Sequence, residues 1–363
     1  MHVLICGGGA IGASLAYFLS RRGARVSVIE STGVACAASG KSGGFLARDW
    51  CDGSPLAPLA RRSFALHGDL AQTLGDDWGY RRVDTYGGFA GFGQPGSGAR
   101  VWMSPAVSVT QALGTGETTA QVDPALFTRA MMRAAERNGA TLRLGRITGV
   151  VQRDGRAVGV ELADETVMGD AVVIALGPWS VLACRWLPLP AVFGLKGHSL
   201  VFDTGGQTPA EAAFLEYREA SGEVLSPELF PRPDGTTYVC GISGEEPLPV
   251  DPAAVAPDPA KIARLEALCA AVSPLLSADK IVARQACYRP IARDGLPLIG
   301  RVPGVAGAYV ATGHSVWGIL NAPATAEAMT GLILDGAPGT VDLAPFDPAR
   351  LPRLDPARLR TGG

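Results

Sequence analysis

The residues near the start of the chain that could do chemistry are three glycines and an acid. Gly7, Gly9 and Gly12 fit the turn that a dinucleotide's pyrophosphate requires, because they allow a tight turn, a close backbone approach and close packing of a helix on a strand. A carboxylate at Glu30 can accept both hydroxyls of a ribose and would repel a 2′-phosphate. This pattern predicts contacts between a dinucleotide and Gly7, Gly9, Ala10, Ile11, Gly12, Glu30 and Ser31.

These residues need a strand, a turn and a helix to position them. The apolar run 2–6 predicts a strand, residues 13–22 predict a helix that Gly23 ends, and residues 25–29 predict a second strand with Glu30 at its end. The N-terminus of the helix would offer unpaired N–H groups and a positive dipole end to the phosphates. This unit alone does not distinguish NAD from FAD.

Size and composition limit the remaining possibilities. A chain of 363 residues suits two interlocked domains, and its 18% charged residues fall below the roughly 25% of an average globular protein. The net charge of −2, without a run of like charges, argues against nucleic-acid binding. The first apolar run is broken by glycines and has no basic leader, so we expect no targeting segment and no membrane span.

The seven cysteines form no CxxC pair and show no spacing typical of a metal site. They predict reduced thiols, a cytoplasmic location and no metal ion. Arginines recur near the end of the chain among prolines and acids, which predicts a solvated terminus. These arginines are Arg350, Arg353, Arg358 and Arg360.

Later segments favour FAD over NAD, because a simple NAD enzyme would continue from Glu30 into a third parallel strand. A loop of small residues follows instead, where a flat ring system could lie against the backbone. Farther on come a buried strand that ends at Gly177, and a glycine-containing turn that leads into a helix predicted over 319–334. We expect further cofactor contacts from Ser39, Lys41, Ser42, Gly43, Gly44, Phe45, Leu46, Ala175, Gly177, Trp179, Gly313, Val316, Gly318 and Ile319.

These motifs, in the order in which they follow along the chain, resemble the D-amino-acid oxidase superfamily, which includes glycine oxidase and sarcosine oxidase. The resemblance extends to the segments Gln121-Val122-Asp123-Pro124 and Arg289-Pro290. The resemblance runs from residue 2 to about residue 336, and it also implies cofactor contacts from Val150, Cys287 and His314. It implies an α/β fold in which a Rossmann-like FAD-binding domain of the glutathione-reductase type carries an inserted, mainly antiparallel substrate domain. The expected FAD domain comprises 1–78, 120–190 and 289–345, the substrate domain 79–119 and 191–288, and the C-terminal tail 346–363.

The resemblance also implies a reaction, namely hydride transfer from a carbon that bears an amine to the flavin N5, which gives an imine. Such a site needs a carboxylate anchor, a dry pocket and a positive helix end near the flavin N1/O2 edge, which the helix beginning near Gly318 could supply. Arg289 matches the arginine that glycine-oxidase-like members use to hold a carboxylate. The alternative is a surface arginine that pairs with Asp294.

Four further residues are candidates for the catalytic pocket. Cys287 matches the place where sarcosine oxidase carries a cysteine linked to FAD, although a small buried thiol beside the ring is the alternative. His314, His198 and Trp317 could line the pocket, or could simply be packed in the core.

Two departures from the family pattern leave the substrate and the electron acceptor open. The stretch 237–240 lacks the lysine that sarcosine oxidase uses with dioxygen, and Val316 and Trp317 stand where glycine oxidase has a second arginine. The partners expected are a small amine or amino acid and dioxygen or another acceptor. The alternatives are a tailoring enzyme for a larger or cyclic amine, and a low-turnover FAD-binding protein with a trafficking or scaffold role.

Overall fold

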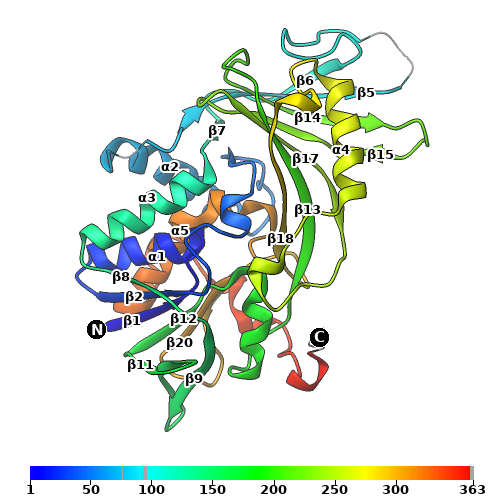
Figure 1. Ribbon diagram of the computed structural model, residues 1–363. Coiled ribbons are helices and arrows are strands. Elements are labelled where there is room, and N and C mark those ends of the chain that lie inside the picture. The colour runs from blue at the N-terminus through cyan, green and yellow to red at the C-terminus, as the bar shows by residue number, and fades with distance from the viewer. Residues whose placement is uncertain (76, 93–95, 360–363) are drawn as a thin grey trace.

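A mostly parallel sheet and a larger, mainly antiparallel sheet organise the chain in the computed structural model, which describes residues 1–75, 77–92 and 96–359 (Figure 1). The parallel sheet has six strands, and only β19 runs antiparallel to its neighbour. In sheet order these strands are β19 (Leu298–Arg301), β20 (Ala308–Thr312), β12 (Ala171–Ile174), β1 (His2–Cys6), β2 (Arg25–Glu30) and β8 (Thr141–Leu144).

Both faces of the parallel sheet are covered, which explains why β1, β12 and β20 are apolar almost throughout. One face packs against helices, and the other packs against a small three-stranded sheet. The helices are α1 (Ala10–Arg21), α3 (Pro124–Arg137) and α5 (Gly318–Leu334), with α2 (Ala57–Thr73) beyond α5. The small sheet consists of β9 (Ile147–Arg153), β10 (Arg156–Leu162) and β11 (Thr166–Met168).

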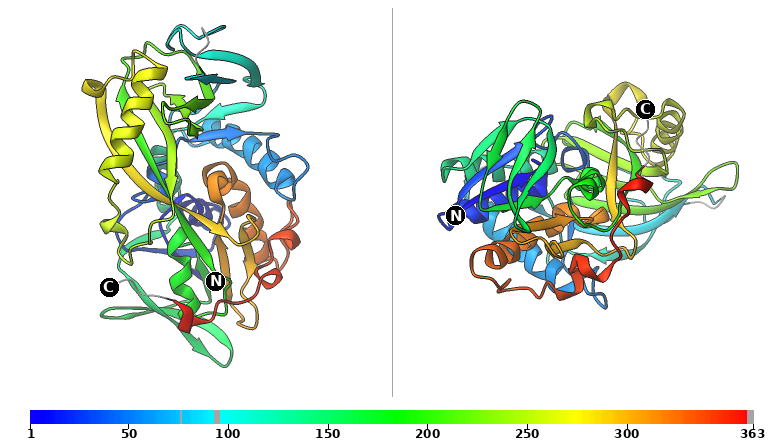
Figure 2. Two further views of the ribbon diagram at one scale, coloured as in Figure 1. Left: turned by 90° about the vertical axis from the view of Figure 1, so that its right-hand side faces the viewer. Right: turned by 90° about the horizontal axis from the view of Figure 1, so that it is seen from below.

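The larger sheet has one face on a helix and the other turned toward the parallel-sheet half of the molecule. Its outer face packs on α4 (Pro259–Val272), which Figure 2 shows on the side away from the parallel sheet. In sheet order its strands are β18 (Ile281–Ala292), β13 (Val192–Asp203), β17 (Thr236–Gly244), β16 (Glu228–Pro231), β14 (Glu211–Arg218), β5 (Asp84–Ala90) and β6 (Ser108–Gly114), and β15 (Val224–Leu225) pairs with β14.

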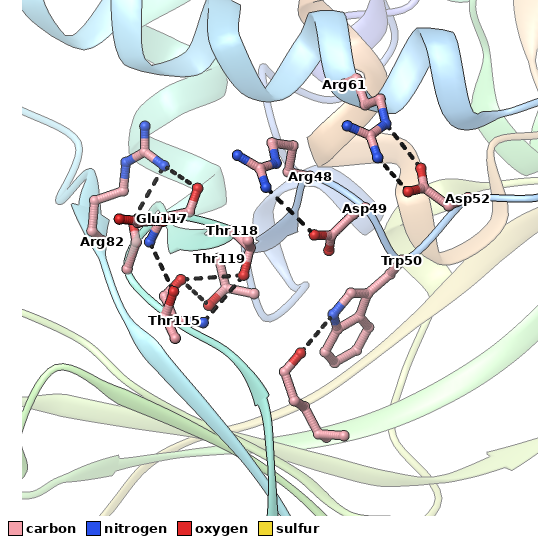
Figure 3. A network of polar contacts seen from close by, with 12 residues as sticks. Arg48, Asp49, Trp50, Asp52, Arg61, Arg82, Thr115, Glu117, Thr118 and Thr119 are labelled. Carbon is pink, nitrogen blue, oxygen red and sulfur yellow. Dashed lines mark hydrogen bonds and ion pairs between the residues drawn. The ribbon is translucent and has the colours of Figure 1, made fainter.

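A third small sheet and a polar network join the two halves. The sheet consists of β3 (Phe45–Ala47), β7 (Thr119–Gln121) and β4 (Arg81–Arg82). Next to it, Arg61 of α2 forms an ion pair with Asp52, and the Trp50 indole N–H donates to the Leu113 carbonyl at 3.2 Å (Figure 3). These contacts fasten the segment after β3 both to a helix of one half and to a strand of the other.

Short 3₁₀ turns complete the chain at its loops and near its end. They are η1 (Ala38–Gly40), η2 (Gly177–Arg185), η3 (Pro252–Ala254), η4 (Ala278–Lys280), η5 (Ser315–Trp317), η6 (Ala344–Phe346), η7 (Pro348–Arg350) and η8 (Pro356–Arg358). Within the described residues, no helix is both long and apolar enough to span a membrane.

The predicted first strand is confirmed at both ends, and the second ends one residue later than expected. The helix between them begins at Ala10 rather than residue 13, because Gly9 is already its N-cap. The predicted helix over 319–334 is also confirmed, with one extra residue at its start.

The prediction of a solvated C-terminal segment is wrong for Arg350. Its guanidinium is largely buried, pairs with Asp294 at 2.8 Å and donates to the Leu296 carbonyl at 2.8 Å. The Leu354 N–H also donates to the Leu189 carbonyl at 2.8 Å, which fastens the segment to the core. Arg360 lies outside the described residues.

Candidate active site

One elongated cavity joins the glycine turn of the parallel sheet to the inner face of the larger sheet. At one end it is bordered by Glu30 and Arg146, and at the other by Glu228 and Arg289. The N-termini of α1 and α5 both reach its wall, which brings two helix dipoles to one space. A long ligand with negative charge at more than one place suits such a cavity.

The glycine turn has the geometry that its sequence predicts. Gly7 has a φ of +114°, and a β-carbon there would overlap the Ala175 carbonyl. A β-carbon at Gly12 would overlap the Gly7 carbonyl, so α1 can approach β1 only with glycine at this position. These two positions therefore exclude any other residue while the turn keeps this shape.

Polar groups around the turn fit the adenosine and phosphate parts of a dinucleotide. Gly9 caps α1 without any side-chain hydrogen bond, while the Ser39 hydroxyl accepts the Ala10 N–H at 2.9 Å. The Glu30 carboxylate accepts the Gly8 N–H at 2.7 Å and the Thr32 N–H at 2.9 Å, which fixes its orientation at the cavity edge. A pyrophosphate would meet first-turn N–H groups, and a ribose would meet an oriented carboxylate.

The N-terminus of α5 is held in place from behind by a buried histidine. The His67 Nε2–H donates to the carbonyls of Ile319 at 3.0 Å and Leu320 at 3.2 Å, and burial lowers the pKa of its ring to about 4. The Ser63 hydroxyl accepts the Ala324 N–H at 3.1 Å, next to Pro323, which has no N–H of its own. These contacts from α2 position the end of α5 that reaches the cavity at Gly318 and Ile319.

The far end of the cavity is built on the larger sheet. Arg289 of β18 extends its guanidinium over Gly197 of β13, and its Nη1–H donates to the Ser243 hydroxyl of β17 at 3.3 Å. Glu228 of β16 and Tyr238 of β17 line the same wall. The buried Tyr238 hydroxyl donates to the Lys41 carbonyl at 3.2 Å, which ties the small-residue loop to the sheet.

The alternative that Arg289 is a surface arginine paired with Asp294 is wrong. Asp294 pairs with Arg350 instead, and that partner holds the pKa of the Asp294 carboxyl below its usual range. Within residues 1–75, 77–92 and 96–359, no carboxylate lies within 4.0 Å of the Arg289 guanidinium. Burial disfavours its charged form, but the summed charges of the surrounding acidic groups, Glu228 among them, outweigh this effect and raise the pKa of Arg289.

The two candidate histidines make structural contacts with their rings. The His314 Nε2 lies 3.1 Å from the Thr325 hydroxyl of α5, and burial lowers the pKa of the ring to about 3. The His198 Nε2 accepts the Asp258 N–H at 3.1 Å, at the start of α4 on the outer face of the sheet. Both residues border the cavity, and one ring nitrogen of each is engaged in these contacts.

The cavity brings together most of the residues predicted from the sequence. Its lining includes Gly7, Gly9, Ala10, Ile11, Glu30, Ser31, Ser39, Ser42, Gly43, Ala175, Gly177, Trp179, His198, Cys287, Arg289, His314, Val316, Gly318 and Ile319.

Eight predicted residues lie behind the lining instead. Phe45 stacks on Phe230 with ring centroids 5.4 Å apart, Val150 packs under the parallel sheet, and Trp317 packs against the helix-side core. The full set outside the lining is Gly12, Lys41, Gly44, Phe45, Leu46, Val150, Gly313 and Trp317.

Several lining residues escaped the sequence prediction. Arg146 and Trp186 border the nucleotide end, and Glu228 and Cys240 border the far end. Glu228 could have been predicted as a site residue from the sequence. It is the first residue of the apolar strand Glu228–Pro231 and faces inward, where a carboxyl group is unusual.

A loop from the larger sheet closes over the nucleotide half of the cavity. Three side chains donate to its carbonyls: Trp179 to Pro249 at 2.8 Å, Arg146 to Val250 at 2.8 Å and Tyr288 to Pro247 at 2.7 Å. Val250 and Pro252 of this loop line the cavity. The loop therefore joins the two halves beside the cavity.

Metal ligands are not gathered anywhere in the part of the chain that the structure describes. All seven thiols are free.

Comparison with known proteins agrees with this geometry. The family model described as DAO, FAD dependent oxidoreductase, matches residues 2–332. A putative oxidoreductase of Schizosaccharomyces pombe is 30% identical to this chain, over 96% of this chain and 97% of its own length. A glycine oxidase of Pseudomonas aeruginosa is 28% identical, over 96% of this chain and 98% of its own length. The crystal structure of glycine oxidase from Geobacillus kaustophilus superposes with a TM-score of 0.82 at 24% identity, over 96% of this chain and 98% of that one.

The chain therefore belongs to the DAO family of FAD-dependent oxidoreductases. Its cofactor is FAD, and the α/β fold predicted from the sequence is confirmed.

Proposed function

We propose that the protein oxidises the C–N bond of a small amine or amino acid to an imine. The observation that carries the proposal is the Arg289 guanidinium, which lies in the wall of the FAD cavity with a hydroxyl, but no carboxylate, at bonding distance among the described residues. A guanidinium in such a place can bind a carboxylate through two parallel hydrogen bonds. The names of the glycine oxidase relatives support an amino acid as the substrate.

In this proposal the bound FAD supplies the hydride acceptor, and the protein supplies position and electrostatics. The N–H groups at the start of α5 would stabilise negative charge at the nearby edge of the flavin, and His67 would keep that helix end in place. Arg289 would orient the substrate by its carboxylate. Trp179 and the loop that it holds would help exclude water.

The test is anaerobic reduction of the bound flavin by a panel of D-, L- and N-methyl amino acids and cyclic imino acids. We expect at least one carboxylate-bearing amine to bleach the flavin absorbance. If none does, the proposal fails, and a low-turnover FAD-binding role is favoured instead.

The same assay tests Arg289 directly. The Arg289→Ala variant should raise the KM for a carboxylate-bearing amine about 10- to 100-fold, because a charge-assisted hydrogen bond is lost. An uncharged amine of similar shape should be affected little. Equal effects on both substrates would remove Arg289 from the role of anchor.

A further inference from the structure

A second charged group shares the inner face of the larger sheet with Arg289. Glu228 of β16 lies opposite Cys240 of β17 in the strand pairing, and both residues line the cavity. From the other side, the Arg289 side chain crosses β13 above Gly197 and reaches β17 at Ser243. A cation and a carboxyl therefore approach the same part of the cavity from strands on either side of β17.

The Glu228 carboxyl is half-buried in the cavity wall and has very few partners. Its Oε2 accepts only a weak contact from the Cys240 thiol at 3.5 Å, and no cation within the described residues lies at ion-pair distance. Burial raises the pKa of this carboxyl, whereas the more distant Arg289 charge opposes the rise. A carboxyl group with so few partners is stabilised by any ligand that brings a cation or a proton to it.

The other titratable side chains that line this end of the cavity favour their neutral forms. Burial lowers the pKa of His198 and of His314. Burial raises the pKa of Tyr238, of Cys240 and of Cys287, so their neutral forms are favoured. Among the residues that line this end of the cavity, the remaining charges are a positive one on Arg289 and a negative one on ionised Glu228. The Lys41 ammonium also acts on Cys287, but Lys41 lies outside the lining, and its ammonium donates to the Ala286 carbonyl at 3.3 Å. That pattern complements a zwitterion, with its carboxylate at Arg289 and its ammonium at Glu228.

We propose that Glu228 binds the amino group of a zwitterionic amino or imino acid, and takes up one of its protons before oxidation. This inference rests on the proposed amine oxidation. One ammonium N–H bond breaks and one carboxyl O–H bond forms, so the substrate changes from R–NH₃⁺ to R–NH₂ while Glu228 changes from carboxylate to carboxylic acid. The nitrogen lone pair released in this way is the pair that forms the C=N bond when the hydride leaves.

The binding test uses two ligands that differ only in the amine. α-Aminoisobutyrate is a zwitterion without a hydrogen to lose as hydride, and isobutyrate is the matching carboxylate without the amine. Binding of each to the FAD-loaded protein is followed by the perturbation of the flavin absorbance. The Glu228→Gln variant should bind α-aminoisobutyrate about tenfold more weakly and isobutyrate about tenfold more tightly, because a negative charge near Arg289 is gone.

The kinetic test follows the pH dependence of anaerobic flavin reduction by the best substrate of the panel. The Glu228→Gln variant should reduce about 100-fold more slowly near pH 7, because the general base is lost. Above the pKa of the substrate ammonium the amine is already neutral, so the rate should return to within a few-fold of the wild-type rate. A loss of the same size at every pH would mean that Glu228 serves only the structure, and would overturn the proposal.

Glu216→Gln is the matched control, because Glu216 is exposed on the adjacent strand β14 and lies outside the cavity lining. It should leave binding and kinetics unchanged. If Glu228→Gln does not retain FAD, Glu228→Asp replaces it and should keep the opposite changes in ligand binding at smaller size. Changes of the same sign for both ligands, or binding of neither ligand by the wild type, overturn the Glu228 assignment. Only a wild-type flavin that no amine bleaches overturns the proposed function.

Discussion

Gly197 leaves room for Arg289 on the inner face of the larger sheet. The guanidinium atoms lie 3.6 to 3.8 Å from the place that a β-carbon at position 197 would occupy. This distance is ordinary van der Waals contact, so a methyl group fits and a longer side chain does not. Without a side chain on β13, the arginine of β18 can reach Ser243 of β17.

The Gly197→Leu variant should therefore displace the guanidinium of Arg289, the proposed carboxylate anchor, while Arg289 itself stays in place in the sequence. We expect the KM for a carboxylate-bearing substrate to rise about tenfold or more, because the displaced guanidinium loses its charge-assisted hydrogen bonds. The Gly197→Ala variant is the matched control and should stay close to the wild type. Steady-state kinetics on both variants decide the matter, and equal KM values for the two would contradict the steric argument.

The thiol of Cys287 should not be linked to FAD. Burial raises its pKa, although Arg289 and Lys41 act in the other direction, so the nucleophilic thiolate is disfavoured. Acid precipitation should give a colourless pellet, with the flavin in the supernatant. A yellow pellet from the wild type that becomes colourless in Cys287→Ser would show a covalent link.

The loop over the nucleotide end should slow the release of FAD. The Trp179→Phe variant removes the indole N–H that donates to the Pro249 carbonyl at 2.8 Å, a loss of about 1 kcal/mol and so roughly a fivefold faster release. The rise of flavin fluorescence after dilution measures the rate. Trp50→Phe is the control, because it removes a similar hydrogen bond to Leu113 away from the cavity (Figure 3). Equal release rates for both variants would show that the loop does not retain the cofactor.

Acid should destabilise the protein in part through His67. Its pKa falls to about 4 in the folded state, below the 6.5 of an exposed histidine, so the unfolded state binds a proton first as the pH drops. The contribution of His67 to the free energy of unfolding is fully present above pH 6.5. It is lost between about pH 6.5 and 4, at about 1.4 kcal/mol per pH unit.

The measurement for His67 is the free energy of unfolding by urea at pH 7 and pH 5. In His67→Gln, whose amide can still donate toward the first turn of α5, the difference between the two pH values should shrink. His2→Gln is the control, because His2 is far less buried and should change the pH dependence less. An unchanged pH dependence in His67→Gln would contradict the assigned cause.

The sequence by itself determined the nucleotide end of the site. The glycine turn, the strands on both sides of it and Glu30 lie within the first thirty residues, where local periodicity and backbone geometry decide the structure. The helix over 318–334 was predictable for the same reason, since its apolar pattern and its glycine-containing entry are local signals.

Only the tertiary structure decided the arrangement at the proposed substrate end of the cavity. Arg289, Gly197, Ser243 and Glu228 stand on four strands of the larger sheet, and the order of those strands does not follow the order of the sequence. The ion-pair partner of Asp294 also could not be predicted from the residues near it in the sequence, because that partner, Arg350, lies in the C-terminal segment. Short-range patterns in a sequence predict single helices and strands. The strand pairing that brings distant charges to one cavity depends instead on contacts between residues far apart in the chain.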